Sequence, residues 1–318
     1  MTVRRVEQGS GGFTRRRAGK GFTYWGANGK RVTNNKQLQR IKDLVIPPAW
    51  DDVWIAASAD DHIQATGVDD AGRLQYIYHP EWRAQQDDEK FIRSLAFADA
   101  LPAVRRRVTK DLKGSDERAR ALAAAVRMID TMGLRVGGSQ YAKENESFGA
   151  STLQRRHVEV TKSIVHLTFR GKSGGEWDVR VKDAALAKFF DSRPKTPRSA
   201  PAVCWPEQQG RRRTWHGVSA ADINAYLAEA SGGHFTAKDF RTWQGTVVAA
   251  QALSRAAKAG DTSPEAVTAA IKTTAEWLHN TPAIARDSYI NPRVIELFEK
   301  GTVISGKATD AKVRALLT

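Results

Sequence analysis

The pattern of hydrophobic and polar positions differs between the first 80 or so residues and the rest of the chain. In this first part, short runs such as DVWIAAS and RLQYIYH are separated by turn sequences such as ANGK and VDDAGR, which predicts short β-strands. One helix is expected at about Lys36–Leu44, because Pro47 and Pro48 follow it. We predict a β-rich N-terminal domain over residues 1–83, which ends where the acidic stretch Ala84–Lys90 gives way to helix formers.

Helical patterning dominates the chain after this stretch. Apolar residues recur at helical spacing from near Ser115 to the sequence GLRVGG, and these are Leu122, Val126, Ile129 and Met132. Further helices are predicted where a capping residue precedes a helical stretch, at Ser219, Thr236, Ser263 and Thr281. The segment Arg193–Gly210 holds four of the eleven prolines and is expected to be a loop. The fold class that follows is α+β, with a larger, mainly helical domain over residues 90–318.

One alternating segment inside the helical part predicts a β-hairpin. Val165, Leu167 and Phe169 alternate with more polar residues, the turn sequence RGKSGGE follows, and the alternation resumes at Trp177. This pattern places Lys172 in the turn of the hairpin.

Composition narrows the class of partner. The 318 residues contain 50 Lys and Arg against 35 Asp and Glu, a net charge of +15, and such an excess attracts polyanions, above all nucleic acid. A basic enzyme that acts on small molecules is the alternative that charge alone leaves open. A single cysteine, Cys204, excludes an intrachain disulfide, and no apolar run has the length of a membrane span, so a cytoplasmic protein without a membrane partner is expected. The seven histidines are scattered, so no metal site is expected on them.

Five polar residues gain meaning from their order along the chain. They lie in the sequences LRVGG, FRGKSGGE, TAKDFRTW and HNTPAIARDSY, and they are Arg135, Lys172, Arg241, Asn280 and Tyr289. Each alone is an ordinary surface or helix-end residue. Together, and with IPPAWDDVWI, HIQATG and LQYIY in the N-terminal part, the chain resembles the type IB DNA topoisomerases, in particular their small poxvirus-like bacterial members.

The resemblance implies a function and a set of site residues. Its catalytic residues would be Arg135, Lys172 as the general acid, Arg241, Asn280, and Tyr289 as the nucleophile. It implies that the two domains clamp duplex DNA and relax positive and negative supercoils through a transient 3′-phosphotyrosine linkage, without ATP, metal or another cofactor. The strand LQYIY would bring four residues to the DNA, namely Arg73, Gln75, Tyr76 and Tyr78. We expect a monomer that acts on the bacterial nucleoid.

One position departs from part of this family. Eukaryotic and poxvirus members carry a histidine where this chain has Asn280, whereas bacterial members can carry asparagine there. The interval of nine residues to Tyr289 favours Asn280 for the role, and the adjacent His279 stays open as an alternative.

The residue types suit phosphodiester chemistry without a metal. Two guanidinium groups are always charged and can each grip phosphate oxygens, and an asparagine amide can donate a further hydrogen bond. Lys172 can protonate a leaving 5′-oxygen, but the motif contains no general base for Tyr289. No phosphate-binding GxxxxGK[ST] loop is present, which agrees with a reaction that needs no ATP.

Two further functions remain as alternatives. Tyrosine recombinases and integrases use similar chemistry, but they usually carry a histidine three residues before the second arginine, where this chain has Lys238. A non-catalytic basic DNA-binding protein is the other alternative, although all five positions hold chemically competent residues.

Overall fold

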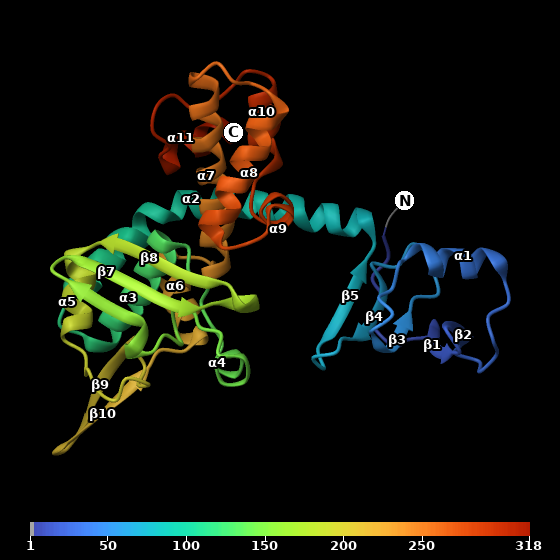
Figure 1. Ribbon diagram of the computed structural model, residues 1–318, viewed down its shortest axis with the longest axis horizontal. Coiled ribbons are helices and arrows are strands. Elements are labelled where there is room, and N and C mark those ends of the chain that lie inside the picture. Colours follow the sequence, from blue (N-terminus) through green and yellow to red (C-terminus); the bar gives the residue numbers. More distant parts are fainter. Residues whose placement is uncertain (1–2) are drawn as a thin grey trace. The chain divides into compact units, whose positions relative to one another are not determined.

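The computed structural model describes residues 3–318, apart from the side chains of Ser173 and Gln209. The chain divides into two compact units, residues 1–90 (unit 1) and residues 91–318 (unit 2). Helix α2 (Pro80–Lys113) runs across the division (Figure 1). The stretch Ala84–Lys90, where the sequence predicts the end of the first domain, is part of this continuous helix.

Unit 1 is built on an antiparallel sheet of five strands in the order β2-β1-β3-β4-β5. Its core forms where α1 places Ile41 among Val53, Ile55 and Ala65 of the sheet. The Asn34 side chain caps α1 by accepting a hydrogen bond from the main chain of Gln37, so the predicted helix is confirmed to within a residue. The elements are β1 (Phe13–Ala18), β2 (Gly21–Gly26), α1 (Asn35–Asp43), β3 (Asp51–Ile55), β4 (Ile63–Val68) and β5 (Leu74–Tyr78).

Unit 2 is mainly helical and surrounds one large hydrophobic core. Its helices are α3 (Glu117–Met132), α4 (Ser139–Asn145), α5 (Ala184–Asp191), α6 (Ala220–Ser231), α7 (Ala237–Lys258), α8 (Pro264–Leu278), α9 (Pro282–Ser288), α10 (Pro292–Glu299) and α11 (Asp310–Leu317). Its strands are β6 (Val158–Thr161), β7 (Ile164–Arg170), β8 (Glu176–Lys182), β9 (Cys204–Gln209) and β10 (Arg212–Gly217), with short 3-10 turns at Arg155–His157 and Lys172–Gly174. The α+β fold class predicted from the sequence is confirmed.

Helix α3 is the centre of unit 2. It contacts α5, α6 and α7 as well as strands β8 and β9. The run Ala121–Ala125 is buried, because small side chains let the neighbouring elements approach the helix from several directions. Asp116 caps the start of α3, and Gly133 ends it in the left-handed conformation, so that the chain leaves α3 two residues before Arg135.

The predicted hairpin is present and belongs to a sheet of three strands in the order β6-β7-β8. In β7 and β8, Phe169 pairs with Trp177 and Arg170 pairs with Glu176, so the turn begins at Gly171. Lys172 is the first residue of the 3-10 turn, as the sequence predicts.

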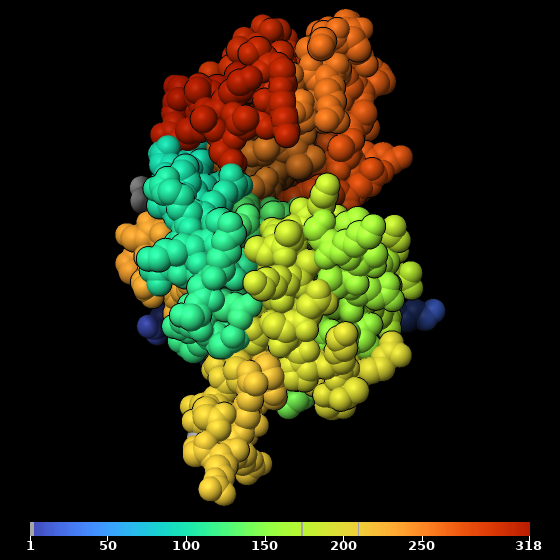
Figure 2. All heavy atoms as spheres, turned by 90° about the vertical axis from the view of Figure 1, so that its left-hand side faces the viewer, coloured from blue at the N-terminus to red at the C-terminus, as the bar shows by residue number. Residues whose placement is uncertain are grey.

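The prediction of a loop over Arg193–Gly210 is wrong for the last part of this segment. Strand β9 pairs with β10 in a two-stranded antiparallel ribbon that extends from the body of unit 2 (Figures 1 and 2). Pro206 lies inside β9 opposite Trp215. A proline cannot donate to a ladder, but each strand of a two-stranded ribbon has one unpaired edge, so the missing N–H is tolerated there.

Within residues 3–318, no helix combines the length and the apolar character that crossing a membrane requires.

Candidate active site

Four element ends and one turn of unit 2 carry the five residues singled out in the sequence. Arg135 follows the end of α3, and Arg241 is the fifth residue of α7. Asn280 lies in the junction between α8 and α9, and Tyr289 caps the C-terminus of α9. Lys172 comes from the turn between β7 and β8. Residues from widely separated parts of the sequence therefore meet in unit 2.

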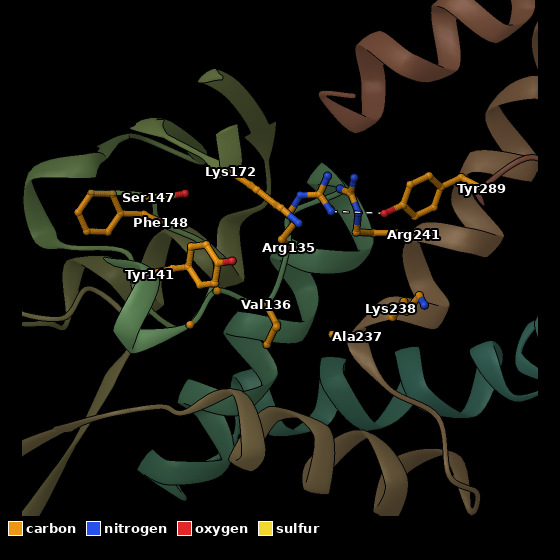
Figure 3. A pocket seen from close by; sticks show the side chains of 12 residues that line it. Arg135, Val136, Tyr141, Ser147, Phe148, Lys172, Ala237, Lys238, Arg241 and Tyr289 are labelled. Atoms are coloured by element: carbon orange, nitrogen blue, oxygen red, sulfur yellow. Dashed lines mark hydrogen bonds between the residues drawn. The ribbon is translucent and has the colours of Figure 1, made fainter. Parts of the chain in front are cut away.

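A cavity of about 360 Å³ brings most of these side chains together (Figure 3). Arg135, Lys172, Arg241 and Tyr289 line it. Asn280 is not among the lining residues, but it is joined to them through Arg135.

Hydrogen bonds connect Arg135 to two of the other candidates. Its Nη2 donates to Asn280 Oδ1 at 2.7 Å. Its Nη1 donates to the Tyr289 hydroxyl at 3.3 Å, and Figure 3 marks this bond with a dashed line. Because an arginine only donates, the amide oxygen of Asn280 must face Arg135, and this leaves the amide nitrogen for another partner. That nitrogen, Nδ2, is buried and has no partner among residues 3–318. The Asn280 amide therefore has one donor that is unused within this part of the chain.

Arg241 is buried, with 3% of its surface exposed, and it connects two helix ends. Its Nη1 donates to the carbonyl oxygen of Gly133 at the end of α3, and its Nη2 donates to the Leu278 carbonyl at 2.8 Å at the end of α8. Burial, together with the charge of Arg135, lowers the pKa of Arg241 to about 10, so the group still carries its charge at neutral pH. Its buried Nε has no partner within the described part of the chain.

Tyr289 is almost fully buried and is held from behind by α7. Thr246 Oγ1 donates to the Tyr289 carbonyl oxygen at 3.1 Å. Gly245 lies so close that a Cβ there would be 2.9 Å from Tyr289 Cβ and 3.0 Å from its carbonyl oxygen. The guanidinium carbon of Arg241 lies 5.1 Å from the centre of the Tyr289 ring. Helix α7 thus supplies both the surface against which Tyr289 packs and one of its two cationic neighbours.

The environment changes the acidity of the Tyr289 phenol. Burial by itself raises the pKa, but the positive charges of Arg241 and Arg135, together with the hydrogen bond from Arg135, outweigh it and lower the pKa to about 8. At pH 7 a phenol with this pKa is ionised in about a tenth of the molecules, against about a thousandth for an ordinary tyrosine. The two arginines therefore favour the ionised form of the Tyr289 phenol.

His279 and Asn280 have different surroundings, although they are adjacent. The His279 ring stacks on Trp177 of β8, with the ring centres 3.8 Å apart and the planes 17° from parallel. Asn280 accepts the hydrogen bond from Arg135. Of the two, Asn280 is the residue that lies in the network with Arg135 and Tyr289.

Lys172 differs from the other four candidates in being exposed. No hydrogen bond or ion pair with another described residue fixes its side chain. The position of its amino group therefore depends on the position of the turn.

Other residues line the same cavity and were not assigned a role from the sequence. Tyr141, Ser147 and Phe148 come from α4 and the loop that follows it. No hydrophobic periodicity or charge pattern in that segment predicts that these three residues line a cavity. Lys238 also lines the cavity, and its position three residues before Arg241 on one helix face could have indicated this.

The four residues assigned to DNA contact lie in unit 1, on β5 and just before it. Tyr76 and Tyr78 are exposed, and their rings stack with centres 5.6 Å apart. Gln75 alternates with them and donates to Asp69 Oδ2 at 2.8 Å. Arg73 also donates to Asp69, at 2.9 Å. Tyr76 and Tyr78 are therefore exposed to solvent, whereas Arg73 and Gln75 are hydrogen-bonded to Asp69.

Within the described residues, no group of three or more His, Cys, Asp or Glu side chains is placed to hold a metal ion.

Comparison with known proteins identifies the family. The model of the eukaryotic DNA topoisomerase I catalytic core matches residues 79–302, and the model of the bacterial DNA topoisomerase IB N-terminal domain matches residues 21–69. A DNA topoisomerase 1B of Acanthamoeba polyphaga mimivirus is 30% identical over 301 residues, which cover 91% of this chain and 88% of the viral protein. The chain belongs to the type IB DNA topoisomerases.

More distant relatives carry related names. DNA topoisomerase I of Monkeypox virus is 24% identical over 241 residues, or 73% of this chain and 71% of that protein. DNA topoisomerase 1 of Mycosarcoma maydis is 25% identical over 196 residues, which are 55% of this chain and only 19% of the fungal protein. The N-terminal match places the chain with the bacterial form of a type IB topoisomerase, and the family decides against the recombinase alternative.

Proposed function

We propose that this topoisomerase relaxes positive and negative supercoils by cutting and resealing one DNA strand through a 3′-phosphotyrosine at Tyr289. The observation that carries this proposal is the state of the Tyr289 phenol, which is hydrogen-bonded by Arg135, close to Arg241, and has a pKa of about 8. An activated phenol between two cations at the edge of a cavity is suited to attack on a phosphodiester.

The first step is attack by the Tyr289 oxygen on phosphorus. The phenol proton passes to solvent, because the lowered pKa leaves part of the population already ionised at neutral pH. Attack places negative charge on the non-bridging phosphate oxygens. Arg135 and Arg241 stabilise this charge, and Asn280 Nδ2, which has no partner among residues 3–318, donates a further hydrogen bond. Removal of one such donor is expected to cost about 10²–10³ in the rate of cleavage.

The second half of the step is departure of the 5′-oxygen. The bond between phosphorus and O5′ breaks while Lys172 Nζ transfers its proton to that oxygen, so that a neutral 5′-hydroxyl leaves. Lys172 lines the same cavity as Tyr289, and its exposed side chain allows it to approach the scissile phosphate. Resealing reverses the sequence, with the 5′-hydroxyl returning its proton to Lys172. The phosphotyrosine keeps the energy of the phosphodiester, so no ATP is needed. Arg135 and Arg241 supply the positive charge that a metal ion would otherwise provide at the phosphate.

DNA contacts outside the cavity hold the duplex. We assign the exposed Tyr76 and Tyr78 of β5 to this task, together with Arg73 and Gln75 once DNA phosphates compete with Asp69. Both units would contact the duplex. We further propose that the protein acts as a monomer, without a cofactor, on cytoplasmic nucleoid DNA.

The test is relaxation of positively and of negatively supercoiled plasmid in EDTA without ATP. The native protein is expected to relax both substrates, and Tyr289→Phe neither. Tyr226→Phe is the matched control, because it removes a tyrosine hydroxyl that bonds Asp111 and does not line the cavity. If the native protein binds plasmid and changes neither topology, the proposed reaction is wrong.

A further inference from the structure

The aromatic pair His279 and Trp177 connects two parts of the active site. Their rings are nearly parallel at 3.8 Å between centres. Trp177 is a buried residue at the start of β8, next to the turn. Its ring also stacks on Phe169 of β7, with the ring centres 5.5 Å apart. His279 is the residue after the end of α8. The contact therefore joins the β7–β8 hairpin to the α8–α9 junction.

The backbone at His279 has a conformation that is unfavourable for a residue with a side chain. His279 is in the left-handed conformation with a φ of 48°, at a helix end where glycine is usual. A residue with a Cβ is strained in this region by roughly 1–2 kcal/mol. The glycine that would relieve this strain could not stack on Trp177.

Trp177 is also in close contact with the turn that carries Lys172. Gly171, the residue before Lys172, lies so close to the Trp177 indole that a Cβ there would clash with Trp177 Nε1. The main chain on both sides of the turn is also joined, because the Gly171 N–H donates to the Gly175 carbonyl at 2.7 Å. A shift of Trp177 would thus be transmitted to the main chain that carries Lys172.

The other side of the contact is adjacent to Asn280. The Leu278 carbonyl, one residue before His279, accepts a hydrogen bond from Arg241. The α8–α9 junction is therefore fixed by Arg241 before His279, by Trp177 at His279, and by Arg135 at Asn280. Burial lowers the pKa of His279, and the charge of Arg241 adds to this, while a hydrogen bond with the Glu176 main chain opposes it. The ring is thus neutral near pH 7 and can stack without adding charge.

We propose that His279 is a positioning residue that, by stacking on Trp177, holds the Lys172 turn in register with Asn280 and Tyr289. This inference rests on the proposed function, because it assigns to His279 the placement of the general acid of that reaction. Lys172 has no partner of its own within the described residues, so its distance from the leaving oxygen is set by its turn. His279 itself transfers no proton in this account.

The experiment measures single-turnover cleavage of two duplexes that differ in one atom. One has the ordinary 5′-oxygen at the scissile phosphate, and the other has a bridging 5′-sulfur. A thiolate leaves without a proton, so cleavage of the sulfur duplex needs no general acid. Lys172→Ala serves as the reference for loss of the acid, and Asn280→Ala for loss of a transition-state donor.

The proposal predicts a specific pattern for His279→Ala. Cleavage of the oxygen duplex should slow by up to about 10²-fold, the size expected for a small misplacement of a catalytic group. Most of this loss should disappear with the sulfur duplex, as for Lys172→Ala and unlike Asn280→Ala. His279→Phe keeps an aromatic ring on Trp177 and should restore most of the rate with oxygen. His216→Ala is the matched control, because it removes another histidine ring packed near a tryptophan, Trp205 of the β9–β10 ribbon, and should leave both rates unchanged.

The outcomes separate the inference from the proposed function. Equal slowing of both duplexes by His279→Ala would overturn the positioning role, provided that sulfur still rescues Lys172→Ala. An unchanged rate in His279→Ala would overturn it as well. If sulfur fails to rescue Lys172→Ala, the acid assigned in the proposed function is itself wrong. Thermal unfolding of each variant distinguishes loss of position from loss of fold.

Discussion

Arg135 and Arg241 both lie near Tyr289, but they have different structural roles. Arg241 is buried and donates to two main-chain carbonyls, so it connects the ends of α3 and α8 as well as providing charge. Arg135 donates to side chains, those of Asn280 and Tyr289, and lines the cavity. Loss of Arg241 should therefore lower both stability and activity, whereas loss of Arg135 should act mainly on activity.

The acidity of Tyr289 gives a prediction for the protein without DNA. A difference titration of tyrosine absorbance, native protein minus Tyr289→Phe, should show one phenol with a midpoint near pH 8. Arg135→Ala should raise that midpoint, because one of the two cations and one hydrogen bond are lost. Tyr226 will not interfere, since burial and its bond to Asp111 raise its pKa above the ordinary value. A midpoint near 10 in the native protein would contradict the account.

The lowered pKa of Tyr289 also determines how this residue makes the stability of the folded protein depend on pH. The pKa of Tyr289 is lower in the folded protein, about 8, than the value of about 10 in an unfolded chain. Ionised Tyr289 therefore stabilises the folded state. This contribution is fully present above pH 10 and is lost as the pH falls through 8.

At the scale of elements, the packing of α7 against the end of α9 decides where the nucleophile lies. Gly245 leaves room for the Tyr289 main chain, and Thr246 binds its carbonyl. Gly245 and Thr246 follow Arg241 within about a turn and a half of α7. One helix thus positions the cation and the tyrosine in fixed relation to each other.

Gly245→Ala tests this packing. The added methyl would meet Tyr289 Cβ and its carbonyl oxygen at about 3 Å, where main-chain atoms cannot move aside cheaply. We expect cleavage to fall by at least about tenfold, with unfolding free energy reduced by about 1–3 kcal/mol and DNA affinity retained. Gly21→Ala is the control, because nothing lies within 4 Å of the added methyl in β2. Native cleavage by Gly245→Ala would show that this close approach does not position Tyr289.

The sequence predicts some of these elements well and others poorly, for physical reasons. The helix around Leu122 and Ile129 and the Lys172 hairpin follow from period and turn residues, which are local. The ribbon of β9 and β10 was missed because its sequence, with a proline and many polar residues, has no buried face to create alternation. The order of five motifs indicated the site, but the stacking of His279 on Trp177 depends on two helix ends and a sheet, and no local signal reports it.

At the scale of the whole molecule, the cationic excess is unevenly distributed between the two units. Residues 1–90 contain 14 Lys and Arg against 12 Asp and Glu, whereas residues 91–318 contain 36 against 23. The unit that carries the candidate active site therefore holds most of the net charge. Because phosphate contacts release condensed counterions, this charge should make DNA binding strongly dependent on salt.

The salt dependence is measurable with Tyr289→Phe, which is expected to bind DNA without cleaving it. If six to ten phosphates are contacted, affinity for duplex DNA should fall by about 10³–10⁵ between about 50 and 200 mM salt. Equilibrium binding at several salt concentrations gives the slope. An affinity that hardly changes over this range would show that the net charge of unit 2 does not meet the DNA backbone.

The central claim is that Tyr289 becomes covalently linked to a 3′-phosphate of DNA. The most direct measurement is to trap the complex on a duplex whose short 5′-hydroxyl strand diffuses away after cleavage, digest it, and locate the attached nucleotide by mass spectrometry. The account predicts one modified residue, Tyr289, joined to the 3′-phosphate, in the native protein and in His279→Ala at a slower rate. Attachment at another residue, or through a 5′-phosphate, would contradict it.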